Sequence, residues 1–190
     1  MNLPNILTFS RILMIPIFVL VFFIPWKWSY IGASALFALA GVTDWLDGYL
    51  ARRWNQATAF GAFLDPVADK LMVAVALMVL VHDHASIWVT LPSVVIVGRE
   101  IVISALREWM AEMGKRASVA VSYLGKIKTA CQMISIVVLL ANEPKTDYSY
   151  FGLALLYVAA VLTLWSMIIY IRAAWPDLSP FRAKNDLSEK

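Results

Sequence analysis

The sequence has few charged residues and almost no cysteine. Only 15% of its 190 residues are charged, whereas 61% are hydrophobic, which is more apolar side chain than a soluble domain of this length carries. The single cysteine, Cys131, excludes an intramolecular disulfide framework and any multi-cysteine metal site. The net charge of +3 is too small to indicate nucleic acid as a partner. The low charge and high apolar content favour a membrane protein.

Six apolar segments are long enough, or nearly so, to cross a bilayer as helices. The hydrocarbon core is about 30 Å thick and needs about 20 apolar residues of helix. The segments are residues 5–25, 29–50, 61–81, 87–107, 124–141 and 150–172. The sequence therefore predicts an all-α integral membrane protein with six transmembrane helices. They form one membrane domain, residues 1–175, and a polar, disordered cytoplasmic tail follows at residues 176–190.

Basic residues gather on one side of the predicted helices. The connections on the other side hold only Lys27 and Lys145 as cations. The basic side carries Arg52, Arg53, Arg107, Lys115, Arg116, Lys126 and Lys128. Because cytoplasmic loops carry an excess of lysine and arginine, we expect both termini to be cytoplasmic.

Four aspartates gather at the cytoplasmic ends of the second and third predicted helices. Asp44 and Asp47 lie three residues apart, and Asp65 and Asp69 lie four apart, so each pair occupies one helical face. Four carboxylates in a partly dehydrated pocket would repel one another unless cations neutralise them. Oxygen ligands without a nearby histidine or cysteine favour Mg²⁺ or Mn²⁺ over zinc. The spacing therefore predicts a divalent metal site.

An alternative gives the aspartates a structural role as helix caps and as ion-pair partners of Arg52, Arg53 and Lys70. Small neighbouring residues favour a ligand site instead, because Gly48, Ala51 and Gly61 leave room for a ligand to approach the backbone closely. Asp65 precedes Pro66, and the residue before a proline avoids the helical conformation. We expect a break or wide turn there that directs Asp65 toward the pocket.

These residues form a motif that resembles the CDP-alcohol phosphotransferase family. The motif reads Asp44-x-x-Asp47-Gly48-x-x-Ala51-Arg52, then eight residues, then Gly61-x-x-x-Asp65-x-x-x-Asp69. The resemblance implies six membrane helices and an enzyme that transfers a phosphatidyl or related group from a CDP-linked donor to an alcohol, releasing CMP. It also implies two divalent ions held by the four aspartates. Asp65 and Asp69 are the expected catalytic residues, with Asp69 as the general base.

Further segments resemble bacterial members that use CDP-diacylglycerol as the donor and glycerol 3-phosphate as the acceptor. They are Asn5-Ile6-Leu7-Thr8-x-x-Arg11, Arg99-Glu100-Ile101, Ser104-x-x-Arg107-Glu108 and Ser122-x-x-Gly125-Lys126-x-Lys128-Thr129. The resemblance implies an enzyme of phospholipid biosynthesis, on the way to phosphatidylglycerol. It further implies a multi-pass protein of the bacterial inner membrane, in contact with membrane lipids, whose active site faces the cytoplasm. A homodimer is compatible with it.

The remaining site assignments concern the two substrates. Donor binding is assigned to Asn5, Thr8, Gly48, Ala51, Arg52 and Gly61, with Arg52 neutralising the diphosphate. The acceptor phosphate needs a cationic site on the cytoplasmic side. Arg107, Arg116, Lys126 and Lys128 can supply it, with Arg99 deeper in the membrane, and we assign it to Arg99, Arg107 and Lys126. The alternative for Arg99 and Glu100 is that they form an ion pair with each other or with residues of neighbouring helices.

Two other functions remain open at this point. One is a sister transferase that uses serine, inositol phosphate or phosphatidylglycerol as the acceptor. The other, from a different class, is an ion or metabolite transporter. His82 and His84 lie on the far side of the predicted membrane, where we expect solvated loop residues rather than ligands.

Overall fold

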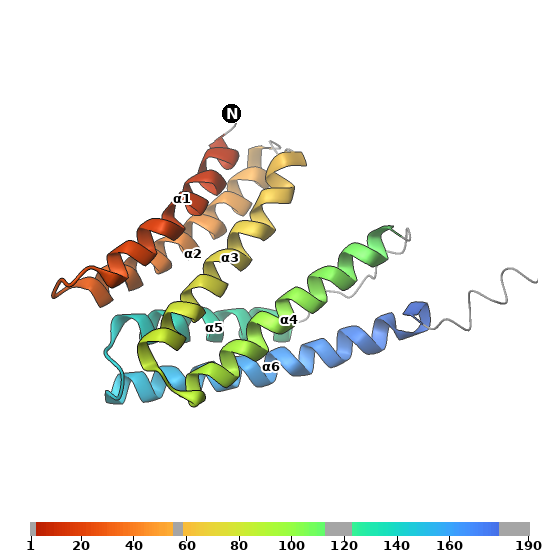
Figure 1. The fold of residues 1–190 in the computed structure, drawn as a ribbon. Coiled ribbons are helices and arrows are strands. Elements are labelled where there is room, and N and C mark those ends of the chain that lie inside the picture. Colours follow the sequence, from red (N-terminus) through yellow and green to blue (C-terminus); the bar gives the residue numbers. More distant parts are fainter. Residues whose placement is uncertain (1–2, 55–58, 113–122, 179–190) are drawn as a thin grey trace, which may run out of the picture.

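The structure is a computed structural model that describes residues 3–54, 59–112 and 123–178, and every regular element in this part of the chain is an α-helix (Figure 1). The helices are α1 Leu3–Phe23, α2 Ser29–Trp54, α3 Ala59–His84, α4 Ile87–Glu112, α5 Tyr123–Ala141 and α6 Asp147–Leu178. Each overlaps one of the six apolar segments in the sequence. The all-helical fold class is therefore confirmed.

Two of these helices meet the length and hydropathy expected of a membrane span. They are Ile87–Glu112, which is all of α4, and Asp147–Arg172, which is most of α6. Large apolar side chains are exposed on both, among them Trp88, Val94 and Val161, each more than 60% exposed. An exposed apolar surface of this extent is unfavourable in water and suits lipid.

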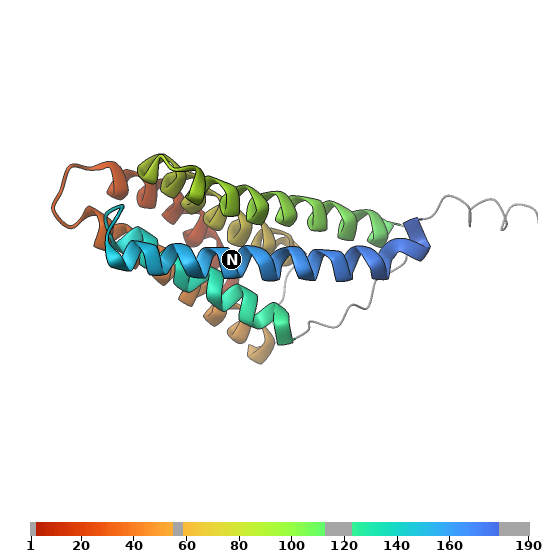
Figure 2. The ribbon, with the colours of Figure 1, turned by 90° about the horizontal axis from the view of Figure 1, so that it is seen from below.

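The helices pack as two groups joined in the middle of the molecule. α1 packs against α2 and α3, while α6 packs against α4 and α5. In Figure 1, α1, α2 and α3 run side by side, and the far end of α3 reaches down to α5 and α6. Figure 2 shows α4 and α6 running side by side along the molecule, in agreement with their contacts. α2 contacts α5, and α3 contacts both α4 and α5, and these contacts connect the two groups.

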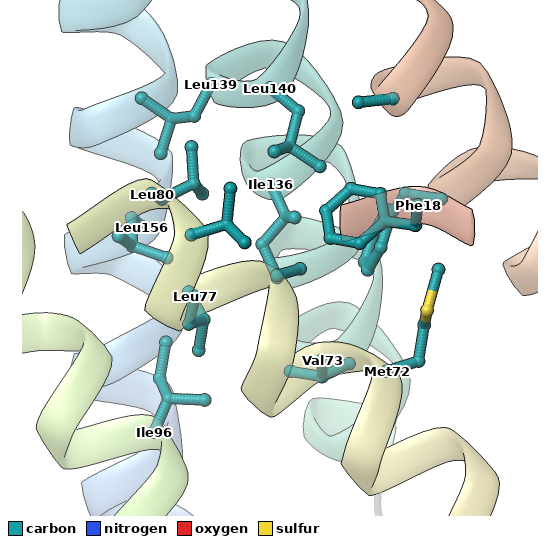
Figure 3. Close-up of a cluster of buried hydrophobic side chains, with 14 of the residues drawn as sticks. Phe18, Met72, Val73, Leu77, Leu80, Ile96, Ile136, Leu139, Leu140 and Leu156 are labelled. Carbon is teal, nitrogen blue, oxygen red and sulfur yellow. The ribbon is translucent and has the colours of Figure 1, made fainter. Parts of the chain in front are cut away.

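A shared apolar core holds these helices together. Each helix contributes at least one side chain that is at most 1% exposed: Phe18, Phe37, Leu77, Ile96, Ile136 and Leu156, in the order of the helices. Figure 3 shows Leu77, Ile136 and Leu156 converging from α3, α5 and α6. Because lipid is as apolar as the core, close packing rather than burial from water holds membrane helices together. The core packing therefore fixes how the helices are oriented, and with it the positions of their polar side chains.

The break that we expected before Pro66 is absent. α3 runs without interruption from Ala59 to His84 and includes Pro66. A proline inside a helix removes one backbone hydrogen bond, which membrane helices tolerate when neighbouring helices support them. Met72 and Ala76 lie buried against the core further along α3. This packing outweighs the local preference of the residue before the proline.

Polar contacts tie the helices together at the end opposite the aspartates. The Tyr30 hydroxyl donates to Asp83 Oδ1 at 3.0 Å, which joins α2 to α3. His84 Nε2 lies 3.0 Å from Ser149 Oγ, which joins α3 to α6. The expectation of a solvated loop is wrong for His84, because this residue lies in the last turn of α3 and its side chain is 7% exposed. His82 is exposed beside Phe23.

Gly152 permits a close approach between α5 and α6. A Cβ atom on Gly152 would lie 2.9 Å from Leu139 Cγ and 3.1 Å from Val138 Cγ1. Both neighbours lie on α5, and Leu139 is fully buried. Ser135 Oγ also donates to the Gly152 carbonyl at 2.7 Å. A larger residue would therefore have to push the two helices apart.

Gly152→Ala is expected to lower the free energy of unfolding by about 1–3 kcal/mol, the usual cost of overpacking a core. Gly98→Ala is the matched control, because nothing lies within 4 Å of a Cβ atom added there. Alanine is about 1 kcal/mol more favourable than glycine in a helix, so the control is expected to be neutral or stabilising. Thermal unfolding in one detergent measures both, and equal midpoints would contradict the close α5–α6 contact.

Candidate functional site

A buried arginine on α1 binds one of the predicted metal ligands on α2. Arg11 Nη1 donates to Asp44 Oδ1 at 2.6 Å. The Arg11 side chain is 2% exposed, whereas that of Asp44 is 44% exposed. A charge inside a membrane helix is costly and needs a partner, and a charge-assisted hydrogen bond of this length is strong. The pair fixes one carboxylate oxygen of Asp44 at the junction of α1 and α2.

Asp44 and Asp69 line the same small pocket. Its polar lining consists of Arg11, Asp44 and Asp69, from α1, α2 and α3. Its apolar lining is Phe37, Ala40, Gly41, Met72, Val73 and Met133. A Cβ atom on Gly41 would lie 2.7 Å from Met133 Cε, so the glycine lets α5 close the pocket. Charges above an apolar floor interact more strongly than charges in water.

The structure therefore brings together two of the four predicted aspartates. Among the predicted donor residues, Thr8 and Gly61 are described and both are buried. Several predicted residues have side chains outside the described part of the structure: Asn5, Asp47, Gly48, Ala51, Arg52, Asp65 and Lys126. The helices that contain them are described, but their contacts are not. Their roles stay predictions.

The described donors suit a hard divalent cation only in part. Asp44 and Asp69 offer oxygen ligands of the kind that Mg²⁺ and Mn²⁺ prefer. Within residues 3–54, 59–112 and 123–178, no three described acidic, histidine or cysteine side chains lie close enough to hold a metal. Arg11 also balances one of the two negative charges. A site for two dications therefore needs the carboxylates of Asp47 and Asp65 as well.

A second polar cluster lies on α4 and joins it to α5 and α6. Arg99 Nη1 donates to Glu100 Oε1 at 2.6 Å, and Lys128 Nζ donates to the same oxygen at 3.0 Å. Arg99 Nη2 also donates to Ser166 Oγ at 3.3 Å. The alternative ion pair of Arg99 with Glu100 is thus confirmed.

The other predicted cations have their own neighbours. The guanidinium of Arg107 lies over the ring of Tyr170, 5.5 Å from its centroid, on the exposed side of α4. Lys70, which we considered as a partner of an aspartate, instead donates to Ser104 Oγ on α4. Asp44 does form an ion pair, as the alternative to a ligand site predicts. Its partner is Arg11, whereas that alternative named Arg52, Arg53 and Lys70.

Arg11 was given no site role from the sequence. It belongs to the quoted motif of the first helix, and its position as a lone charge within an apolar segment was the available signal. Lys128 was one of the cations that the sequence offered for the acceptor site, but it was not among the three residues assigned to it. Its burial, with a side chain 7% exposed, distinguishes it from a surface lysine.

Comparisons with known proteins agree with the motif. The family model of CDP-alcohol phosphatidyltransferase matches residues 1–165. A protein of Pseudomonas fluorescens is 59% identical over 180 residues, which cover 94% of this chain and 92% of that protein. A protein of Escherichia coli K12 is 57% identical over 177 residues, covering 93% and 97% respectively.

Both relatives are named CDP-diacylglycerol–glycerol-3-phosphate 3-phosphatidyltransferase, as is a protein of Shigella flexneri serotype 5b that is 57% identical over the same length. The resemblance read from the aspartate motif is confirmed by a match that includes all four aspartates and extends from the first helix into the last. The chain belongs to the CDP-alcohol phosphatidyltransferase family.

Proposed function

We propose that this chain transfers the phosphatidyl group of CDP-diacylglycerol to glycerol 3-phosphate, giving phosphatidylglycerophosphate and CMP. Relatives that carry the name of this reaction are 57–59% identical over nearly the full length of both chains. The structural observation that carries the proposal is the pocket in which Asp44 and Asp69, from the two motif helices, meet beside Arg11. The same names favour glycerol 3-phosphate over another acceptor and an enzyme over a transporter.

The reaction is a displacement at phosphorus. The acceptor hydroxyl attacks the phosphorus that bears diacylglycerol, the bond from this phosphorus to CMP breaks, and the hydroxyl proton passes to a base. In the proposal, Asp69 accepts this proton, since a base must lie within hydrogen-bond reach of the attacking hydroxyl. Arg11 holds Asp44 by Oδ1 and so fixes this carboxylate in the pocket that Asp69 also lines.

The proposal includes a metal-dependent reaction. Asp44, Asp47, Asp65 and Asp69 would hold two ions of Mg²⁺ or Mn²⁺, which supply charge neutralisation for the diphosphate when bound. Donor binding is assigned to Asn5, Thr8, Gly48, Ala51, Arg52 and Gly61. Of these, Thr8 is 1% exposed on α1, three residues before Arg11, which supports a donor site that begins beside the aspartate pocket.

The proposal also includes the topology. Six crossings with both termini in the cytoplasm would place the aspartates at the cytoplasmic face of the inner membrane, among the basic connections. The acceptor is a soluble dianion, so its site must open to the cytoplasm. Arg99, Arg107 and Lys126 are the proposed cations of that site. Membrane lipids surround the bundle, and a homodimer is the proposed assembly.

The first test removes the ligand charges. Asp44→Asn, Asp47→Asn and Asp65→Asn are each expected to abolish turnover, because each removes one negative charge from a site that must hold two dications. The protein should remain in the membrane, since losing an intramembrane charge does not unfold the helices. CMP release from CDP-diacylglycerol is measured over a titration of Mg²⁺ and Mn²⁺. Asp147→Asn, at the exposed far end of α6, is the control and should behave as wild type.

The second test separates the two roles of Asp69. If Asp69 is chiefly the base, Asp69→Asn should lower kcat by about 10²–10⁴-fold, the usual worth of acid–base catalysis, while donor binding survives. Donor affinity is measured by equilibrium binding of CDP-diacylglycerol in detergent. If Asp69→Asn loses donor binding as well as kcat, then Asp69 is chiefly a metal ligand and another residue is the base.

The third test concerns the acceptor. Arg107→Ala or Lys126→Ala should raise KM for glycerol 3-phosphate by about 10–100-fold, because each removes a charge-assisted hydrogen bond to phosphate. The KM for the donor should barely change. Lys145→Ala, on the opposite side of the membrane, is the matched control. An unchanged acceptor KM in both variants would leave these cations with a purely topological role.

A further inference from the structure

One carboxylate oxygen holds two cations from different helices. Glu100 Oε1 accepts from Arg99 Nη1 at 2.6 Å and from Lys128 Nζ at 3.0 Å. The Arg99 and Lys128 side chains are only 12% and 7% exposed, and that of Glu100 is 27% exposed. Arg99 Nη2 also donates a hydrogen bond to Ser166 Oγ on α6. We call Arg99, Glu100, Lys128 and Ser166 the Glu100 cluster. It fixes two mostly buried cations at the junction of α4, α5 and α6.

The charges of this cluster do not balance. Two cations face one carboxylate, and Lys128 also experiences the positive charge of Arg107. Among the described ion pairs, Glu100 is the one carboxylate that Arg99 and Lys128 contact. Arg99 and Lys128, the two mostly buried cations, exceed the one carboxylate by one positive charge, and the exposed Arg107 adds a further positive charge near Lys128. An uncompensated buried charge is costly, and a phosphate monoester anion would offset it.

The cluster also retains an unused donor. Arg99 Nε is buried and has no hydrogen-bond partner among the residues that the structure describes. A buried N–H without a partner is rare and calls for an explanation. A guanidinium whose Nη atoms are held by Glu100 and Ser166 has a fixed plane. Its Nε–H is therefore held in one fixed direction.

Two contacts connect the cluster to the aspartate pocket. Lys70, which follows Asp69 on α3, donates to Ser104 Oγ, and Ser104 Oγ in turn donates to the Glu100 carbonyl at 2.6 Å. Asp69 also lies within electrostatic range of both Asp44 and Glu100. The cluster is thus placed beside the residue that is proposed to receive the acceptor's proton.

We infer that Glu100 is a positioning residue for the acceptor phosphate, which holds Arg99 and Lys128 together so that both meet the same dianion. Lys128, one of the cations that the sequence offers for the acceptor site, then binds the phosphate together with Arg99. The inference rests on the proposed function, because it takes glycerol 3-phosphate as the acceptor. Glu100 touches neither reacting atom, and it acts through the two cations that it holds.

The test is a kinetic comparison of Glu100→Gln with Glu100→Asp. Glutamine keeps the size of the side chain but removes its charge, so Arg99 and Lys128 repel each other and separate. KM for glycerol 3-phosphate should rise about 10-fold, the worth of one hydrogen bond to a charged group. KM for CDP-diacylglycerol should stay unchanged, and kcat should fall less than KM rises. Glu100→Asp keeps the charge and should recover part of the acceptor affinity.

A double-mutant cycle tests whether Glu100 acts through Lys128. In a Lys128→Gln background, Glu100→Gln should raise the acceptor KM by much less than 10-fold, because Lys128 is already gone and no longer repels Arg99. Additive effects would overturn the inference. Glu112→Gln is the matched control, since Glu112 lies exposed at the end of the same helix. It should leave all three constants unchanged.

The remaining outcomes also decide the matter. A wild-type chain that releases no CMP with glycerol 3-phosphate overturns the proposed function, and the inference with it. A wild-type chain that does so, together with a Glu100→Gln variant whose acceptor KM is unchanged or lower, overturns the inference alone. A loss of thermal stability with equal changes in both KM values makes Glu100 structural. If Glu100→Gln does not fold, Ser166→Ala removes the Arg99 Nη2 bond, and it should raise the acceptor KM alone.

Discussion

The ion pair between Arg11 and Asp44 is the constraint on which the site depends. A buried guanidinium in an apolar helix needs an anion within reach, and Asp44 supplies one at 2.6 Å. This requirement fixes the rotation of α1 relative to α2, and therefore which face of each helix meets the pocket. Asp69 then completes the pocket from α3. A polar contact of this kind can specify helix register in a way that apolar side chains surrounded by lipid cannot.

The same physical rule operates at two further points of the bundle. Glu100 joins cations of α4 and α5 and lies within electrostatic range of Asp69. At the opposite end, Asp83 and His84 join α3 to α2 and α6 through Tyr30 and Ser149. Polar groups are few in this chain, and several of the buried ones join two helices, among them Arg11, Ser34 and Ser135. The aspartate pocket and the Glu100 cluster are neighbours, connected through Lys70 and Ser104.

Close packing allows these polar contacts to form. Helices in lipid gain little from burying apolar surface against one another, so small residues at crossings decide how near they come. Gly152 lets α6 approach Leu139 of α5, and Gly41 lets Met133 of α5 close the pocket floor. The approach of α5 to both α2 and α6 in turn places Lys128 within 3.0 Å of Glu100.

The sequence by itself determined the helical class, the six segments and the position of the aspartate motif, because apolar length and residue spacing are local properties. It also determined the family, since eight motif residues at fixed spacing leave little room for coincidence. It did not determine the partner of Asp44, the continuity of α3 through Pro66, or the burial of His84 and Lys128. Each of these depends on which helices meet and at what angle. Only the tertiary structure decided them, because a buried charge pairs with whatever packing brings near it, however distant in the chain.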